Sequence, residues 1–434
     1  MPSASLAVAD PGVTARNQRV RYYGILLLLF LAGAINYVDR QTLSVLKPAV
    51  KTALGTDEAG YALLLNIFTF CYAGAYIASG WVVDRIGAHR GLMIFIILWS
   101  MATIGCGFAT TFMTFAICRA LLGLAEPGNQ PAGIRALTLW VVPERRGLVM
   151  SLVGTGSTLG SIVAAPLIAW LATDFGWHAA FVAPGGLGLL IGAAWWVVYR
   201  HPTHSHSTGA QTNVPAPALN WPQLWRHRSL WGIVLARFVS DPVWYFCLFW
   251  MPGYFQEECG LTLAQAGKIA WIPFFAASIG GILLATLSDK VGKRINSPMQ
   301  GRVRILIGAA MFGPIAILVP HVSNLTGTVL LLCGVAVVCM GWLGTLGPLV
   351  ADTFPAGNVA SVWGIAGAFG AFGAILFNHQ VGQISSHLGT TNMFLVLGCL
   401  HLISAAILRL LVRNVNVGTP LSAEQTSATS QPPR

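Results

Sequence analysis

Long apolar runs separated by short polar segments repeat along the whole chain. Spanning the hydrocarbon core of a bilayer as a helix takes about 20 mostly apolar residues. Twelve runs meet this length, and they cover residues 22–46, 60–83, 91–109, 112–140, 147–172, 180–199, 229–256, 266–288, 303–321, 327–350, 358–381 and 391–412. The pattern predicts an all-α membrane protein with twelve transmembrane helices.

The amino-acid composition also indicates lipid rather than water as the solvent. Of the 434 residues, 55% are hydrophobic and only 9% are charged, whereas soluble domains carry about 25% charged residues. The opening segment MPSASLAVADPG is polar and lacks the apolar core of a signal peptide, so the first run is expected to remain as a span. The eight cysteines fit no metal or disulfide spacing. We therefore expect no metal and no other cofactor.

The longest polar segment between runs divides the twelve spans into six and six. Residues 200–228 are rich in Ser, Thr, Pro and His, which predicts a solvated linker. A metal role for its histidines is the weaker alternative. The expected organisation is an N-terminal tail at 1–21, a six-helix half at 22–199, this linker, a second six-helix half at 229–412 and a C-terminal tail at 413–434.

The formal net charge of +11 could indicate a nucleic-acid partner or a charged membrane face. Its distribution decides between them, because most basic residues lie in short clusters between apolar runs. Under the twelve-span topology these clusters fall on one side, whereas Lys47, Lys51 and Lys268 fall on the other. Cytoplasmic loops hold the excess of Lys and Arg. We therefore expect both termini to be cytoplasmic and no nucleic acid to be bound.

One short motif occurs twice, at equivalent places in the two halves. GWVVDRIGAHR follows the second run, and ATLSDKVGKR follows the eighth. An aspartate here can lie against a helix N-terminus or an arginine, which predicts a charge latch that closes one side of the protein. Loop charges that only orient the chain are the alternative. Two copies favour the latch and two pseudo-symmetric halves. The assigned gating-loop residues are Gly80, Asp84, Arg85, Gly87, Arg90, Asp289, Lys290, Gly292 and Arg294.

Ionisable residues also lie inside the predicted spans, where charge is costly and usually functional. They are Asp39, Arg40, Arg119, Glu126, Arg135, Arg237 and Asp241. Carboxylates in a low-dielectric site resist ionisation and can therefore carry protons. This reasoning makes Asp39 and Glu126 candidates for proton coupling.

Each of these charges also has a structural interpretation. Asp39 could pair with an arginine to join two helices, and Glu126 could form a static pair with Arg119, seven residues earlier on a similar helix face. Arg135 lies near the cytoplasmic end of its span, which is typical of a snorkelling anchor. Arg237 and Asp241 are spaced i and i+4, so they could form an intrahelical pair or contact a substrate.

Arg40 is the best candidate to bind an anion. A planar guanidinium holds a carboxylate or phosphate through two parallel hydrogen bonds. Tyr37 lies one turn earlier and Tyr72 lies within the second span. Their rings and hydroxyls could contact a sugar, although a buried tyrosine is more often part of a core.

Several segments resemble the anion:cation symporter family of the major facilitator superfamily, in particular its hexuronate branch. They are INYVDRQTLSV in the first span, RALLGLAEPGNQPAG in the fourth, GWHAAFVAPGGLG before the sixth, ARFVSDPVWYFCLFWMPGYF in the seventh and WIPFFAASIGG in the eighth. The resemblance implies the major facilitator fold and proton-coupled import of a hexuronate or related sugar acid across the inner membrane. Transport would proceed by alternating access around a site at the membrane midplane.

The resemblance also implies roles for particular residues. In bacterial sugar-acid members the first-span aspartate and fourth-span glutamate couple protons, which match Asp39 and Glu126. Residues matching Arg40, Tyr37 and Tyr72 hold the sugar acid. In the second half the corresponding candidates are Trp244, Tyr245, Trp363, Asn378 and His379. The expected partners are a small anionic sugar acid, protons and the lipid bilayer, with the protein acting as a monomer.

Two other functions can be compared with this one. An organophosphate or phosphate exchanger of the same fold could use Arg40 and Arg237, which hold roughly matching places in the two halves. The buried acids argue against it, because an exchanger needs no proton carrier. An embedded enzyme is excluded on sequence grounds, since the intramembrane histidines, His379 and His401, form no recognisable catalytic pattern.

Overall fold

The computed structural model describes residues 11–200, 218–249 and 271–412, with positions 251, 254, 255, 258–261, 265 and 269 between them. Every long element in these ranges is a helix: α1 (Pro11–Val45), α2 (Lys47–Leu54), α3 (Glu58–Phe108), α4 (Phe112–Ala125), η1 (Glu126–Gly128), α5 (Asn129–Trp140), η2 (Pro143–Arg145), α6 (Arg146–Phe175), α7 (Ala179–Val198), α8 (Trp221–Arg226), α9 (Arg228–Phe249), α12 (Trp271–Arg294), α13 (Pro298–Ala310), η3 (Gly313–His321), α14 (Leu325–Thr353) and α15 (Val359–Leu411).

The described parts of the twelve predicted runs lie in these helices, but the boundaries differ in four places. The ninth run is divided between α13 and the 3₁₀ helix η3. Helix α3 contains the second and third runs, separated by Gly87, whose φ of 88° and ψ of 159° turn the chain. Helix α15 contains the last two runs. The fourth run is interrupted by the 3₁₀ helix η1. Pro127 lies within that turn, and its missing N–H removes one α-helical hydrogen bond.

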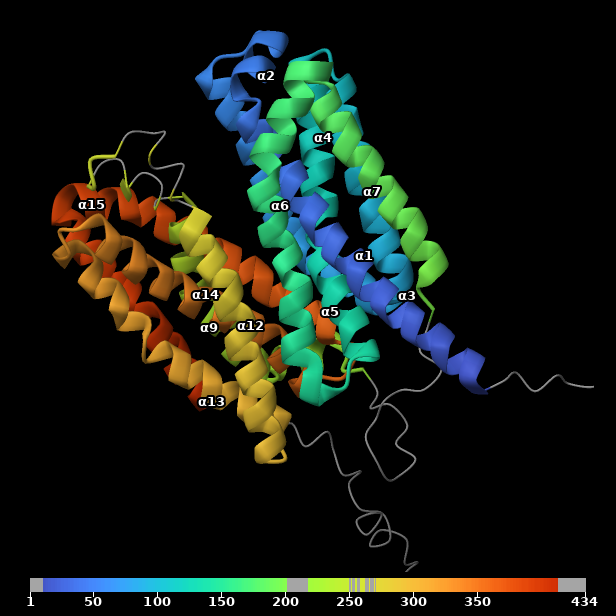
Figure 1. Ribbon diagram of the computed structural model, residues 1–434, viewed down its shortest axis with the longest axis vertical. Coiled ribbons are helices and arrows are strands. Elements are labelled where there is room, and N and C mark those ends of the chain that lie inside the picture. Colours follow the sequence, from blue (N-terminus) through green and yellow to red (C-terminus); the bar gives the residue numbers. More distant parts are fainter. Residues whose placement is uncertain are drawn as a thin grey trace, which may run out of the picture.

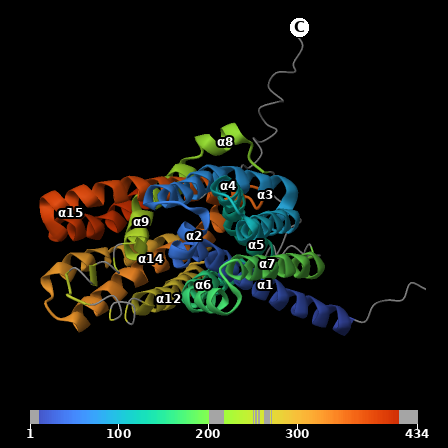
Figure 2. The same cartoon turned by 90° about the horizontal axis from the view of Figure 1, so that it is seen from above.

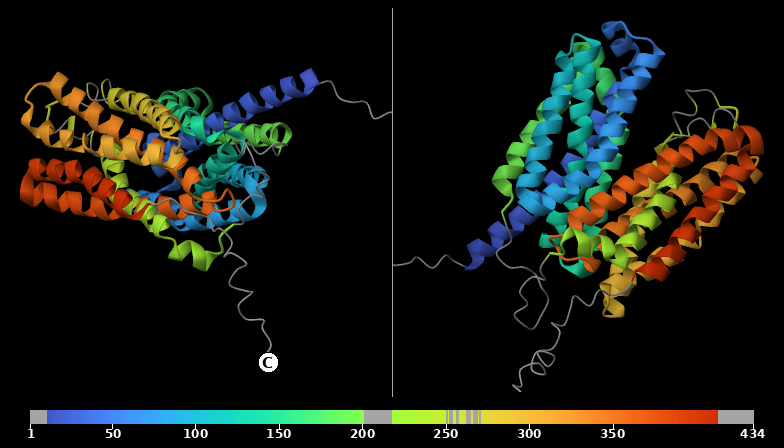
Figure 3. Two further views of the ribbon diagram at one scale, coloured as in Figure 1. Left: turned by 90° about the horizontal axis from the view of Figure 1, so that it is seen from below. Right: turned by 180° about the vertical axis from the view of Figure 1, so that it is seen from behind.

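The helices form two groups that meet at one end and diverge toward the other (Figures 1 and 3). Helices α1 and α3–α7 pack together in the first group, and α9 and α12–α15 pack together in the second. The two most extensive contacts between the groups join α3 to α15 and α6 to α12, and they lie on opposite sides of the molecule (Figure 2). Helix α5 also contacts α14 and α15, and α6 also contacts α14. One cluster of buried apolar residues extends across both groups, and a further cluster lies within each group.

Large apolar side chains also point outward from both groups. Phe70 in the first group is 84% exposed, and Leu330 in the second group is 65% exposed. Apolar surface of this extent is unfavourable in water, whereas it suits the hydrocarbon of a bilayer. The outer faces of the helices thus agree with the membrane location that the hydropathy pattern predicts.

Candidate functional site

A buried ion pair joins α1 to the break between α4 and α5. Arg40 donates to Glu126 Oε2 from Nη2 at 2.9 Å and from Nε at 3.2 Å. The Glu126 side chain is fully buried, whereas the Arg40 side chain is 28% exposed. Arg40 can therefore meet a ligand from one side while its carboxylate partner stays shielded.

Glu126 takes this position because the helix is broken there. It caps the end of α4 and begins the 3₁₀ helix η1. At Gly128 a side chain would overlap the ring of Phe95, so the turn packs closely against α3. Short 3₁₀ segments within long helices often mark functional hinges.

Aromatic rings of α1 and α3 surround the two arginines of this cluster. The Arg40 guanidinium carbon lies 4.7 Å from the ring centroid of Tyr72 and 5.1 Å from that of Tyr37. Arg119 lies 4.5 Å from the centroid of Phe68. The structure thus brings together the predicted residues Tyr37, Arg40 and Tyr72.

Several polar atoms around this pair are buried without a hydrogen-bond partner among the described residues. They include both carboxylate oxygens of Asp39, Oε1 of Glu126, Nε and Nη1 of Arg119 and the hydroxyl of Thr103. Unsatisfied buried polar atoms are rare and costly. Glu126 pairs with Arg40, so the suggested static pair between Glu126 and Arg119 is wrong in this conformation. The suggested pairing of Asp39 with an arginine is likewise not formed.

The second half carries its own buried ion pair within α9. Arg237 donates to Asp241 Oδ2 from Nη2 at 2.7 Å and from Nε at 3.0 Å. The guanidinium stacks over Trp363 of α15 at 4.5 Å. At Gly370 a side chain would overlap the Asp241 carboxylate, so α15 approaches the pair closely. The intrahelical pair that the i, i+4 spacing allows is therefore formed.

The remaining candidates of the second half divide into three cases. Tyr245 lies close enough to Arg40, Tyr37 and Tyr72 of the first half, and to Asp241 of the second, to interact with them electrostatically. Trp244 instead packs edge-on against Phe274 of α12, with 5.8 Å between ring centroids. The side chains of Asn378 and His379 lie outside the described residues.

Asp84 connects the first half to the start of α15. Its Oδ1 accepts from the backbone N–H of Ala360 at 3.2 Å, and its Oδ2 accepts from Ser361 N–H at 2.6 Å. Arg135 lies 3.3 Å from the same carboxylate and also donates to the carbonyl of Val83. Both kinds of contact suggested by the motif, a helix N-terminus and an arginine, are present.

Asp289, in the second half, makes the equivalent contacts with a helix of the first half. Its two carboxylate oxygens accept from the N–H groups of Gly147 at 3.1 Å and Leu148 at 2.8 Å, at the start of α6. Arg302 of α13 forms an ion pair with it. Free N–H groups at a helix N-terminus favour a carboxylate. We call the contacts of Asp84 and Asp289 the latch, and the end of the molecule where they lie the latched end.

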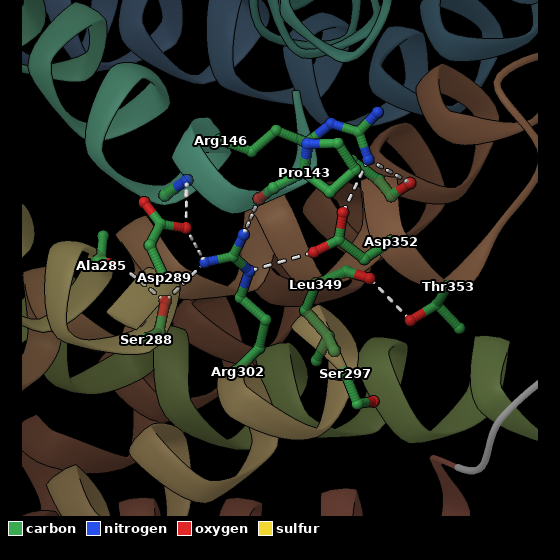
Figure 4. A network of polar contacts seen from close by, with 12 residues as sticks. Pro143, Arg146, Ala285, Ser288, Asp289, Ser297, Arg302, Leu349, Asp352 and Thr353 are labelled. Carbon is green, nitrogen blue, oxygen red and sulfur yellow. Dashed lines mark hydrogen bonds and ion pairs between the residues drawn. The ribbon is translucent and has the colours of Figure 1, made fainter. Parts of the chain in front are cut away.

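A larger charge network surrounds Asp289 (Figure 4). Arg302 also donates to Asp352 of α14 at 3.2 Å and to the Pro143 carbonyl at 2.8 Å. Arg146 binds the other oxygen of Asp352 at 2.6 Å. Sequence reasoning counted the two arginines only as orienting charges and did not single out Asp352. A charge at the end of each apolar run was their only sequence signal.

Each latch contact contains a glycine, but on different helices. In the first contact the glycine is on the helix that carries the aspartate, and in the second it is on the facing helix. A side chain on Gly80 would overlap the carbonyl oxygen of Ala360 across the α3–α15 contact. In the second copy Ala285 replaces the first glycine, and the facing residue on α6 is Gly147, where a side chain would overlap the Ala285 carbonyl. One glycine is thus retained at each contact, which explains how the helices approach closely at the second motif although it lacks the first glycine.

Other predicted gating residues have different positions. Gly292 and Arg294 lie within α12 rather than in a loop, and the turn falls at Asn296, whose φ is 52°. Gly292 instead allows close packing, since a side chain there would lie 2.9 Å from Pro298 Cα. Arg85 stacks on Trp81 at 5.2 Å. The side chains of Arg90, Lys290 and Arg294 are exposed.

The segment preceding α9 is fixed to the latched end. Asn358, the N-cap residue of α15, accepts from Leu219 N–H at 2.7 Å and donates to the Leu219 carbonyl at 2.9 Å. Helix α8 follows directly, and with Asp84 and Trp81 it lines a cavity of about 240 Å³. The predicted linker residues 201–217 lie outside the described residues.

Comparison with known proteins gives consistent results. The model of the Major Facilitator Superfamily matches residues 29–378. The "Probable L-galactonate transporter" of Escherichia coli K12 is 30% identical, covering 79% of each chain, and the "Hexuronate transporter" of that strain is 26% identical, covering 91% of this chain and 94% of its own. A solved structure of the E. coli fucose:proton symporter FucP matches with a TM-score of 0.71 at 14% identity, covering 92% of this chain and 100% of that one.

Proposed function

Because this chain belongs to the Major Facilitator Superfamily, and is a multi-pass membrane transporter rather than an enzyme, we propose that it imports a sugar acid together with protons. The observation that carries this proposal is the partly exposed Arg40 bound to the buried Glu126. Relatives named as transporters of hexuronate, galactonate and galactarate or D-glucarate support the substrate class.

In the proposed coupling of sugar-acid and proton transport, the substrate carboxylate and Glu126 compete for the guanidinium of Arg40. A substrate carboxylate that binds Arg40 bidentately displaces Glu126 Oε2 from its two hydrogen bonds. Glu126 then lacks a counter-charge in a buried position and takes up a proton, because an unpaired buried carboxylate is strongly disfavoured. Asp39, whose oxygens have no hydrogen-bond partner in the described part of the chain, is the second proton carrier.

The proposed transport cycle opens the latched end while the opposite end closes. The excess of basic residues in the loops at the latched end supports a cytoplasmic location for this end. The halves diverge toward the other end (Figure 1), so this conformation is assigned as outward-facing. Release of the substrate into the cytoplasm requires Asp84 and Asp289 to leave the two helix N-termini.

An exchanger of organic phosphates is less consistent with the site. That function needs no proton carrier, whereas this site holds the buried carboxyl groups of Asp39 and Glu126. The two functions differ in what drives uptake. Purified protein in vesicles, given labelled galactonate, galacturonate or galactarate, is expected to accumulate a sugar acid when the outside is acidic and to lose this uptake with a protonophore. Uptake that ignores the pH gradient and needs internal phosphate would reject the proposal.

A further inference from the structure

The Arg237–Asp241 pair has no role in the proposed coupling of Arg40 and Glu126. Its side chains are 8% and 9% exposed, and Nη1 of Arg237 has no partner among the described residues. A buried arginine with a free donor can bind a second acceptor without breaking its existing contacts. Trp363 covers one face of the guanidinium and fixes its plane.

A row of tyrosines connects this pair to Arg40. Tyr72 and Tyr76 follow each other by one turn on α3, with stacked rings 5.5 Å apart. Arg40 lies over Tyr72, and Arg237 lies close enough to Tyr76 and Tyr245 to interact with both electrostatically. The two arginines therefore occupy the two ends of one aromatic row, Arg40 in the first half and Arg237 in the second.

The order of residues along α3 also indicates how far each arginine lies from the latched end. Tyr72, Tyr76 and then Asp84 approach the latched end in sequence, so Arg237 lies on the latched side of Arg40. The Tyr76 ring packs against Gly367 of α15, where any side chain would overlap it. Tyr76 thus lies where the two halves meet, between the Arg40 site and the latch.

We propose that Arg237 is a second carboxylate-binding position, which makes the site selective for six-carbon sugar diacids. One carboxylate of the diacid binds Arg40 and displaces Glu126, and the other accepts from the free Nη1 of Arg237 while Asp241 keeps its two hydrogen bonds. The hydroxyl-bearing chain between them lies along Tyr72, Tyr76 and Tyr245. A sugar acid with one carboxylate uses Arg40 alone. This inference rests on the proposed sugar-acid function and specifies its substrate.

Three ligands with the same sugar configuration test the proposal. Galactonate and galacturonate carry a carboxylate at opposite ends of the chain, and galactarate carries one at both. The protein variant is Arg237→Gln with Asp241→Asn, which removes the pair without leaving an unpaired charge. A charge-assisted hydrogen-bonded pair contributes enough for about a ten- to hundredfold change in affinity. Galactarate binding, measured by calorimetry, is expected to weaken by that factor, while the two monoacids change less than about threefold.

The outcomes separate this inference from the proposed function. Wild-type protein that binds galactarate no more tightly than galactonate overturns the diacid proposal, and this measurement does not depend on the variant folding. Equal weakening of all three ligands, with thermal unfolding unchanged, also overturns it. Either result leaves monoacid transport standing. Failure of all three ligands to bind wild-type protein would reject the sugar-acid function itself. Arg40→Lys is the matched control, because it should weaken all three.

Discussion

Asp84 and Asp289 bind the N-termini of two different helices, and each helix belongs to the opposite half of the molecule. Both carboxylates accept from the second and third N–H groups of the helix, Ala360 and Ser361 of α15 in one case and Gly147 and Leu148 of α6 in the other. The same pair of hydrogen bonds therefore joins the two halves at both helix contacts of the latched end, α3 with α15 and α6 with α12.

Replacing Asp84 with Asn should open this end more often. An amide keeps one acceptor but loses the charge that favours the helix N-terminus and Arg135, a loss of about 1.5–3 kcal/mol for the closed conformation. We expect slower transport with nearly unchanged substrate affinity, measured by vesicle uptake and by calorimetry. Lys293→Gln, at an exposed position of α12, is the control that should behave like wild type. A large loss of affinity with normal cycling would contradict the latch.

The close helix contacts predict a steric effect at Gly80. A methyl group there would meet the Ala360 carbonyl, so Gly80→Ala should force α3 and α15 apart and disfavour the latched conformation. Spin-label distances across the latched end should lengthen. Gly74→Ala in the same helix is a matched control, because nothing lies within 4 Å of its added carbon. Equal distances in the two variants would show that this contact does not limit closure.

Glu126→Gln separates coupling from a structural role. Glutamine resembles the protonated acid, so the variant should still exchange substrate between the two faces of a vesicle but fail to concentrate it in response to a pH step. Arg40 is partly exposed, so its lost partner should reduce thermal stability less than the roughly 3–5 kcal/mol typical of a broken buried pair. Asp174→Asn, at an exposed site, is the control. Normal pH-driven uptake by the glutamine variant would remove Glu126 from the mechanism.

Arg40→Lys should weaken sugar-acid binding even though the charge is retained. Lysine is a point charge and cannot form two parallel hydrogen bonds to one carboxylate. We expect a roughly tenfold or greater rise in the dissociation constant, measured by calorimetry. Unchanged binding would mean that another residue holds the carboxylate.

Asn358→Ala should release the segment that precedes α8. Both amide atoms of Asn358 bind the backbone of Leu219, and alanine removes both hydrogen bonds. Amide hydrogen exchange at Leu219 and in α8 should accelerate, whereas exchange within α14 should not change. Unaltered exchange at Leu219 would show that other contacts hold this segment.

Much of the fold follows from the sequence because a membrane restricts the chain to few solutions. Runs of about 20 apolar residues must become helices, since backbone groups in hydrocarbon have to be satisfied within the segment. Gly87 turns the chain where the repeated motif places it. The same cost of buried charge identified Asp39, Arg40, Glu126 and Asp241 before any partner was known.

The partners of these residues depended on the tertiary structure. Glu126 and Arg119 share one helix segment, but the 3₁₀ turn at Pro127 and the packing of α1 bring Arg40 to Glu126 instead. The sequence likewise does not reveal that Gly147 takes the place of Gly80 in the second latch contact, because Gly147 and the motif it packs against lie in different halves. Sequence determined which residues bear charge inside the membrane and which segments span it. Only the packing of helices far apart in the chain decided which charges meet, because hydropathy and spacing carry no information about the neighbour of a helix.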